Sequence, residues 1–331
     1  MQVDGLIAKS CNGESFSREE LIFLLSIPPV APESFKIIAR AREISGKLVS
    51  RKAEIHGQLA LDLAPCPCDC KFCSFAVSNQ VFRKETRISP DAAVRYAQQF
   101  QEQSVNSIYV MTTALYPFDL FIEMSIEIKK NLGPEVIMLA NVGDQSLERA
   151  ETIRDAGYTG VYHALRMREG VDTLIPGHVR KKSIRNFQAA GLKVGTCVEP
   201  VGPEHTNEEL ADAILFAASI NPAFSGAARR ISIPGTEMEK RGMISELRMA
   251  QIVAVTRLGT PGSVKGICTH EPCTLGALAG ANLFWAETGS NPRDTHEKTE
   301  QGRGHGVGRC RAIFQESEWG ILKGPSVYFS D

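Results

Sequence analysis

The sequence predicts an α/β protein built on a full or partial (β/α) TIM-type barrel, with N-terminal helices and a C-terminal loop extension. Short apolar segments alternate with helical segments along most of the chain. About six to eight such units in succession indicate a parallel sheet with crossover helices. The length of 331 residues also suits a barrel, since such folds run to about 250 residues or more.

Residues 1–50 are predicted as a helical extension. Ser17 and Glu20 form a capping-box pattern before an apolar run. The proline-rich stretch 28–32 separates this helix from a second one near Glu33–Ile44.

Residues 51–290 are predicted as the barrel itself. Its helices carry start and stop signals, such as Thr206 before the helix Asn207–Ser219 and Gly191 after Lys181–Ala190. The predicted strands are Gln58–Leu63, Ser107–Met111, Val136–Ala140, Gly160–Leu165, Lys193–Val198, Ala228–Ile233, Val264–Ile267 and Leu283–Ala286.

The last segment, residues 291–331, departs from the alternating pattern and is predicted as a C-terminal cap made of ordered loop. It contains Arg293, Arg303, His305 and Arg309, which suggest either an anion site for a substrate or a solvated surface.

Charge and hydropathy exclude several classes of partner. The chain has 37 Lys and Arg against 38 Asp and Glu, a net charge of −1. It therefore has no overall positive electrostatic field that would attract nucleic acid. No apolar run approaches the roughly 20 residues that span a bilayer, and the first residues lack the apolar core of a secretion signal. The expectation is therefore a cytoplasmic protein without a nucleic acid or membrane partner.

Nine cysteines are the most informative feature of the composition, and an odd number argues against a disulfide framework. Cys66, Cys70 and Cys73 are spaced C-x3-C-x2-C directly after the first predicted strand, with Cys68 between them. Three thiolates on one loop can hold three irons of a cubane cluster and leave the fourth iron open. A structural zinc site is the alternative, and it requires a fourth ligand.

This cysteine loop, with Phe72 before its last cysteine, resembles the signature of the radical S-adenosylmethionine (SAM) superfamily. The segment CPCDCKFC is similar to the loop of the biotin synthase-like group, which includes the hydrogenase H-cluster maturase, methylornithine synthase and the two-component lipoyl synthase. The resemblance covers roughly residues 17–290.

The resemblance implies a [4Fe-4S] cluster whose open iron binds SAM. Reductive cleavage of SAM then yields a 5′-deoxyadenosyl radical, which abstracts hydrogen from an aliphatic C–H bond. An electron donor, either flavodoxin or ferredoxin, is implied as a partner.

The resemblance also implies where SAM binds. Thr112 and Thr113 occupy the place of the motif that meets the SAM amino group. Arg166 and Arg185 are the candidates for its carboxylate, because a guanidinium matches a carboxylate, with Arg168 and Arg180 as competitors. The candidates beside adenine are Phe72, Val201 and Gly202.

The later cysteines suggest an auxiliary iron–sulfur cluster held by Cys268, Cys273 and Cys310, with Cys197, Cys11 or His270 completing it. The alternative is that they are buried thiols. With a second cluster, sulfur insertion in cofactor biosynthesis is expected, on a small molecule or an acyl chain bound to a carrier protein. Without it, a radical rearrangement or metallocofactor maturation is expected. A non-catalytic iron–sulfur scaffold is the rival from another class.

Overall fold

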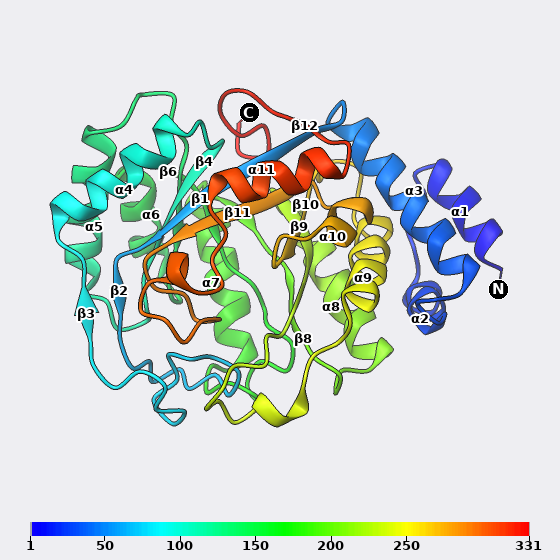
Figure 1. Ribbon diagram of the computed structural model, residues 1–331, viewed down its shortest axis with the longest axis horizontal. Coiled ribbons are helices and arrows are strands. Elements are labelled where there is room, and N and C mark those ends of the chain that lie inside the picture. Colours follow the sequence, from blue (N-terminus) through cyan, green and yellow to red (C-terminus); the bar gives the residue numbers. More distant parts are fainter. Residues whose placement is uncertain (1, 331) are drawn as a thin grey trace.

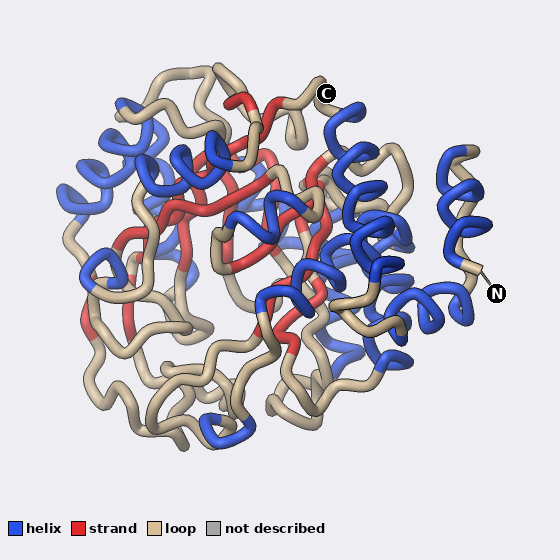
Figure 2. The backbone as a smooth tube through the Cα atoms, turned by 45° about the vertical axis from the view of Figure 1, so that its right-hand side comes forward, coloured by secondary structure: helices blue, strands red, loops and turns tan. Residues whose placement is uncertain are grey.

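The computed structural model describes residues 2–330 and contains a curled parallel sheet ringed by helices (Figures 1 and 2). The order of its strands is β7-β6-β5-β4-β1-β11-β10-β9-β8. These strands are β1 (Lys52–Ala60), β4 (Ser107–Met111), β5 (Met138–Asn141), β6 (Tyr158–Tyr162), β7 (Lys193–Gly195), β8 (Val198–Val201), β9 (Phe224–Arg229), β10 (Gly266–His270) and β11 (Leu283–Thr288). Two short strands, β2 (Asp62–Leu63) and β3 (Thr86–Arg87), pair antiparallel, and β12 (Gly320–Ile321) pairs with β1.

The two edge strands, β7 and β8, follow each other in the chain and are separated by residues 196–197 alone. Main-chain hydrogen bonds from Thr196 N to Phe224 O (3.1 Å) and from Ala223 N to Val194 O (2.8 Å) link the residues around this interruption to the start of β9. These bonds join the two edges of the curled sheet, which forms a TIM-type barrel, as the alternating pattern predicted.

Helices on the outside of the sheet bury their apolar faces against it. Thr206 caps α8 through a capping box with Glu209, which satisfies backbone N–H groups at the start of that helix. The outer helices are α4 (Pro90–Glu102), α5 (Phe118–Lys130), α6 (Leu147–Asp155), α7 (Gly177–Ala189), α8 (Asn207–Ser219), α9 (Glu246–Gly259), α10 (Thr274–Leu278) and α11 (Val307–Glu316).

Strand alternation divides the buried side chains into an outer and an inner core. On β11, Phe284 joins the outer core, where its ring stacks on that of Phe314 at 4.0 Å between centroids. Leu283 and Trp285 belong instead to the inner core, inside the barrel. A residue's place in its strand therefore decides whether it faces the helices or the lumen.

Aromatic side chains fill the end of the lumen at which the strands begin. Tyr328 and Phe329, from the end of the chain, pack there beside the buried His56. The C-terminus accordingly lies at the edge of the molecule opposite the long loops in Figure 1. Chemistry is thereby restricted to the other end of the barrel, where the strands finish.

The N-terminal helices α1 (Val3–Cys11), α2 (Arg18–Ser26) and α3 (Pro32–Leu48) lie beside α8 and α9 (Figure 1). The predicted capping box of Ser17 and Glu20 is present at the start of α2. None of the helices formed by residues 2–330 combines the length and apolarity that a membrane crossing requires.

Some boundaries differ from the sequence-based expectation. The first strand begins at Lys52 rather than at Gln58, and the strand expected over Ala228–Ile233 occupies Phe224–Arg229. The tail expected as loop contains the helix α11. Its buried residues Val307, Cys310, Ile313 and Phe314 follow helical spacing, a signal that the glycine-rich segment before it concealed.

Candidate active site

A cavity of about 1150 Å³, including its mouth, opens where the barrel strands end. Side chains from the carboxyl ends of several strands line it, among them Met111 of β4, Asn141 of β5, Tyr162 of β6 and His270 of β10. Concave sites of this size bind small molecules. The position matches the end of the barrel at which catalysis is expected.

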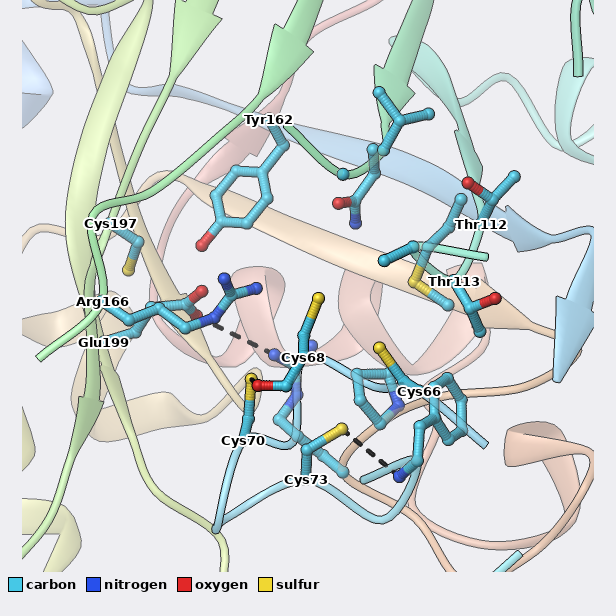
Figure 3. A pocket seen from close by; sticks show the side chains of 18 of the residues that line it. Cys66, Cys68, Cys70, Cys73, Thr112, Thr113, Tyr162, Arg166, Cys197 and Glu199 are labelled. Atoms are coloured by element: carbon cyan, nitrogen blue, oxygen red, sulfur yellow. Dashed lines mark hydrogen bonds and ion pairs between the residues drawn. The ribbon is translucent and has the colours of Figure 1, made fainter. Parts of the chain in front are cut away.

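The loop after β2 brings four cysteines to this cavity, namely Cys66, Cys68, Cys70 and Cys73. Hydrogen bonds within the loop fix its shape: Cys66 N donates to Phe75 O at 2.6 Å, and Cys73 N donates to Cys70 O at 2.9 Å. Figure 3 shows the four sulfur atoms gathered at one side of the cavity. The loop therefore places its thiols as a group.

The environment distinguishes these thiols electrostatically. A hydrogen bond from Cys68 lowers the pKa of the Cys66 thiol, and the same contact, together with burial, raises the pKa of Cys68. Burial raises the pKa of Cys70 to about 11 and also raises that of Cys73. The two shifts have opposite directions, and the pKa of Cys66 is the lower of the two. Three such thiols beside an open cavity fit the donor set of a cluster with one unprotected iron.

Arg166, just beyond β6, projects into the cavity beside Glu199 of β8 (Figure 3). Burial opposes its charge, but attraction to Cys70, Glu169 and Glu199 raises the pKa of the guanidinium above its ordinary value. Within residues 2–330 the guanidinium has no hydrogen-bond acceptor. It is therefore a charged fork available to an anionic ligand.

Arg185, the second arginine predicted to meet the SAM carboxylate, does not line the cavity. Arg185 lies on the exposed face of α7, whereas Arg180 is buried and lines the cavity. The buried face of α7 follows Arg180, Ser183, Ile184 and Phe187, so helical spacing places Arg185 outside it.

Thr112 and Thr113 line the cavity directly after β4, as expected. Thr113 N donates to Asp62 Oδ1 at 2.8 Å, and the Thr113 hydroxyl donates to the other oxygen of the same carboxylate. Asp62 thereby orients the turn that carries both threonines.

A smaller adjoining cavity of about 550 Å³ is lined by Phe72, Pro200 and Ile231, with Arg166 and Glu199 at its boundary with the larger one. Phe72 therefore lies at a ligand-sized space, as expected. Val201 and Gly202 do not, because Val201 is buried in the outer core and Gly202 is enclosed by the side chains of Glu204 and Arg230. The part of β8 that lines this cavity is Glu199 and Pro200, one or two residues before the predicted pair.

Two polar groupings at the cavity contain residues that the sequence analysis did not single out, namely Asp144 and His163 in the first and Glu287 in the second. In the first, His163 Nε2 lies 2.9 Å from Asp144 Oδ1 and 3.1 Å from Arg180 Nη1. Burial lowers the pKa of His163 to about 4, so that its ring is neutral at pH 7. A neutral ring between a carboxylate and a guanidinium holds Arg180 in place.

In the second grouping, Glu287 of β11 lies 3.3 Å from both His270 Nε2 and Arg293 Nη2. Asn291 Nδ2 also donates to it, at 2.6 Å. Burial alone would raise the pKa of Glu287, but the charges of His270 and Arg293 lower it to about 2. Arg293 thus belongs to the cavity, while Arg303 instead pairs with Glu271. The signal in the sequence that could have identified both groupings is that their polar residues lie at or just after the ends of strands.

The structure does not gather the cysteines predicted to bind an auxiliary cluster. Cys197 and Cys268 meet in the lumen, with their Sγ atoms 3.7 Å apart. Cys310 lies in the outer core, where its thiol donates to Trp285 O at 3.3 Å, and Cys273 caps α10. The sheet separates Cys310 from the lumen, so of the cysteines expected at an auxiliary cluster only Cys197 and Cys268 are in contact.

Comparison with known proteins agrees with this geometry. Residues 65–217 match the radical SAM superfamily. The biotin synthases of Streptomyces avermitilis and Streptomyces coelicolor are each 23% identical over 264 residues, which cover 77% of this chain and 67% and 64% of theirs. The biotin synthase of Rickettsia felis is 27% identical over 262 residues, covering 73% of this chain and 84% of its own.

Solved structures share the fold. Methylornithine synthase superposes with a TM-score of 0.80 at 15% identity, covering 96% of this chain and 97% of its own. The FeFe-hydrogenase maturase HydG from Carboxydothermus hydrogenoformans gives a TM-score of 0.78 at 16% identity, covering 96% and 78%. Residues 65–217, with the cysteine loop at their start, thus match the radical SAM superfamily, and the chain as a whole is similar to biotin synthases.

Proposed function

We propose that this chain is a radical SAM enzyme that abstracts hydrogen from an aliphatic C–H bond of a small polar molecule held in the barrel. One observation carries the proposal: Cys66, Cys70 and Cys73 face the same cavity as the unpartnered guanidinium of Arg166. When bound, the cluster and SAM supply a 5′-deoxyadenosyl radical.

The chain's own residues provide positioning and enclosure. Arg166 offers its fork to the SAM carboxylate, and the turn of Thr112 and Thr113 offers hydroxyl and backbone groups to the SAM amino group. The adjoining cavity beside Phe72 has the apolar character and size for adenine. The aromatic plug at the far end of the lumen leaves one entrance, which keeps water from the reacting atoms.

The second polar grouping supports a polar substrate. His270, Glu287 and Arg293 line the cavity, and among the described residues the Nε of Arg293 is buried without a hydrogen-bond partner. A substrate with an anionic group would satisfy that arginine, while an amino or hydroxyl group would suit Glu287.

The candidate reactions differ in what happens to the substrate radical after hydrogen is abstracted. Sulfur insertion requires a sulfide source in the lumen, and the separation of Cys310 from Cys268 counts against the cluster first expected to supply it. This geometry favours a rearrangement or a metallocofactor maturation. The similarity to biotin synthases keeps sulfur insertion as the second candidate.

The test is anaerobic reconstitution followed by incubation with dithionite and SAM, with 5′-deoxyadenosine as the measured product. We expect product from the intact chain and from Cys11→Ala, whose thiol is exposed on α1, and none above background from Cys70→Ala. A full complement of iron without 5′-deoxyadenosine would instead support an iron–sulfur scaffold. Replacing dithionite by flavodoxin or ferredoxin then identifies the class of electron donor.

A further inference from the structure

Cys197 and Cys268 form a pair of thiols inside the barrel that the proposed radical chemistry does not use. Both side chains are almost fully buried, at 4% and 1% exposure, and both line the main cavity. Their Sγ atoms are 3.7 Å apart. Figure 3 shows Cys197 on the cavity wall near Tyr162 and Glu199, apart from the cysteine loop.

The two thiols reach each other across an intervening strand. Cys268 of β10 lies opposite Gly226 of β9, and the residue after Cys197, Val198, pairs with Ala227 on the other side of β9. A Cβ at position 226 would come within 2.6 Å of the Cys268 sulfur. Because residue 226 is glycine, the space between the two thiols stays open.

This arrangement disfavours a disulfide. Backbones two strands apart are separated by roughly 9–10 Å, since neighbouring strands lie about 4.8 Å apart. Cysteines whose Cα atoms are more than about 7 Å apart cannot be bridged without moving the backbone. The sulfur atoms converge although the backbones do not.

One ion accommodates the same separation without any movement. Two thiolates bound to one tetrahedral cation at about 2.3 Å each have sulfur atoms about 3.8 Å apart. We propose that Cys197 and Cys268 are paired ligands for one thiophilic divalent cation, such as Zn²⁺ or Fe²⁺, within the barrel lumen.

The pair supplies only part of a coordination sphere. Among residues 2–330, no third His, Cys, Asp or Glu side chain joins this pair in a group that could hold an ion. The remaining positions therefore face the cavity and are open to a ligand that enters it, with a thiol or sulfide as the matching soft donor. Binding exchanges the two thiol protons for the cation, so two protons are released for each ion bound.

The inference is independent of the SAM chemistry and is tested by a separate signal. The anaerobically reconstituted protein is loaded with one equivalent of Zn²⁺, and its zinc K-edge spectrum is recorded, to which the iron of the cluster does not contribute. We expect two sulfur neighbours at about 2.3 Å in the intact chain. Two protons per zinc should appear in a weakly buffered titration.

Matched variants locate the site. In Cys197→Ser and Cys268→Ser, one sulfur neighbour should disappear and zinc affinity should fall at least about tenfold, since each loses one of two thiolates. Cys310→Ser, which changes an equally buried thiol of the outer core, should bind zinc as the intact chain does. A zinc shell without sulfur in the intact chain, or one whose sulfur persists in both lumen variants, overturns the proposal. The measurements on the intact chain decide the question even if a variant fails to fold.

Discussion

Replacing Arg166 by Met should weaken SAM binding while leaving the cluster in place. Arg166 is half-buried and its guanidinium faces the cavity, where within the described chain it has no acceptor of its own. A carboxylate that reaches it therefore gains a charge-assisted hydrogen bond without breaking another. Such bonds contribute about 1.5–3 kcal/mol. At about 1.4 kcal/mol per tenfold change, the dissociation constant of SAM should rise roughly 10- to 150-fold.

The assay is equilibrium dialysis of labelled SAM against the anaerobically reconstituted protein, with iron content measured on the same sample. Arg185→Met is the matched control, because that side chain is exposed on α7, outside the cavity lining. Its dissociation constant should stay within about twofold of the intact chain, as for a surface change. An equal loss in both variants, or a larger loss in Arg185→Met, would refute the assignment of Arg166.

Three further predictions concern the cluster, acid stability and packing. Alanine at any of the three proposed cluster cysteines should reduce reconstituted iron to near zero, whereas Cys68→Ser should retain it; iron loss in Cys68→Ser would show that this thiol is a ligand. His163, with its folded pKa of about 4 against an ordinary 6.5, takes up a proton on unfolding, so stability falls as pH drops through this interval. The shift corresponds to about 3 kcal/mol, and urea unfolding of His163→Gln should show a correspondingly smaller loss between pH 6.5 and 4; an unchanged pH dependence would contradict the assignment. Gly195→Ala places a methyl group 2.0 Å from the Phe224 ring and should lower the free energy of unfolding by about 1–3 kcal/mol, while Gly308→Ala, with open space around it, should not lower it. Thermal unfolding of the two variants provides the comparison, and equal melting temperatures would count against the packing argument.

The sequence by itself determined the class of fold and the position of the cysteine loop. Alternating apolar strands and capped helices are local patterns, and each is recorded in a few neighbouring residues, as at Ser107–Met111 and Asn207–Ser219. The spacing of Cys66, Cys70 and Cys73 is local in the same sense, since one loop carries all three.

The tertiary structure decided which distant residues share the cavity. Arg180 rather than Arg185 enters it because the packing of α7 selects one helical face. Cys197 and Cys268 meet because the curled sheet turns both side chains into the lumen, whereas Cys310 lies on α11, which packs in the outer core. The sequence indicated metal chemistry from its cysteines but could not say which later cysteines share the lumen. That depends on contacts between residues far apart in the chain, which place Cys197 and Cys268 inside the sheet and Cys310 outside it.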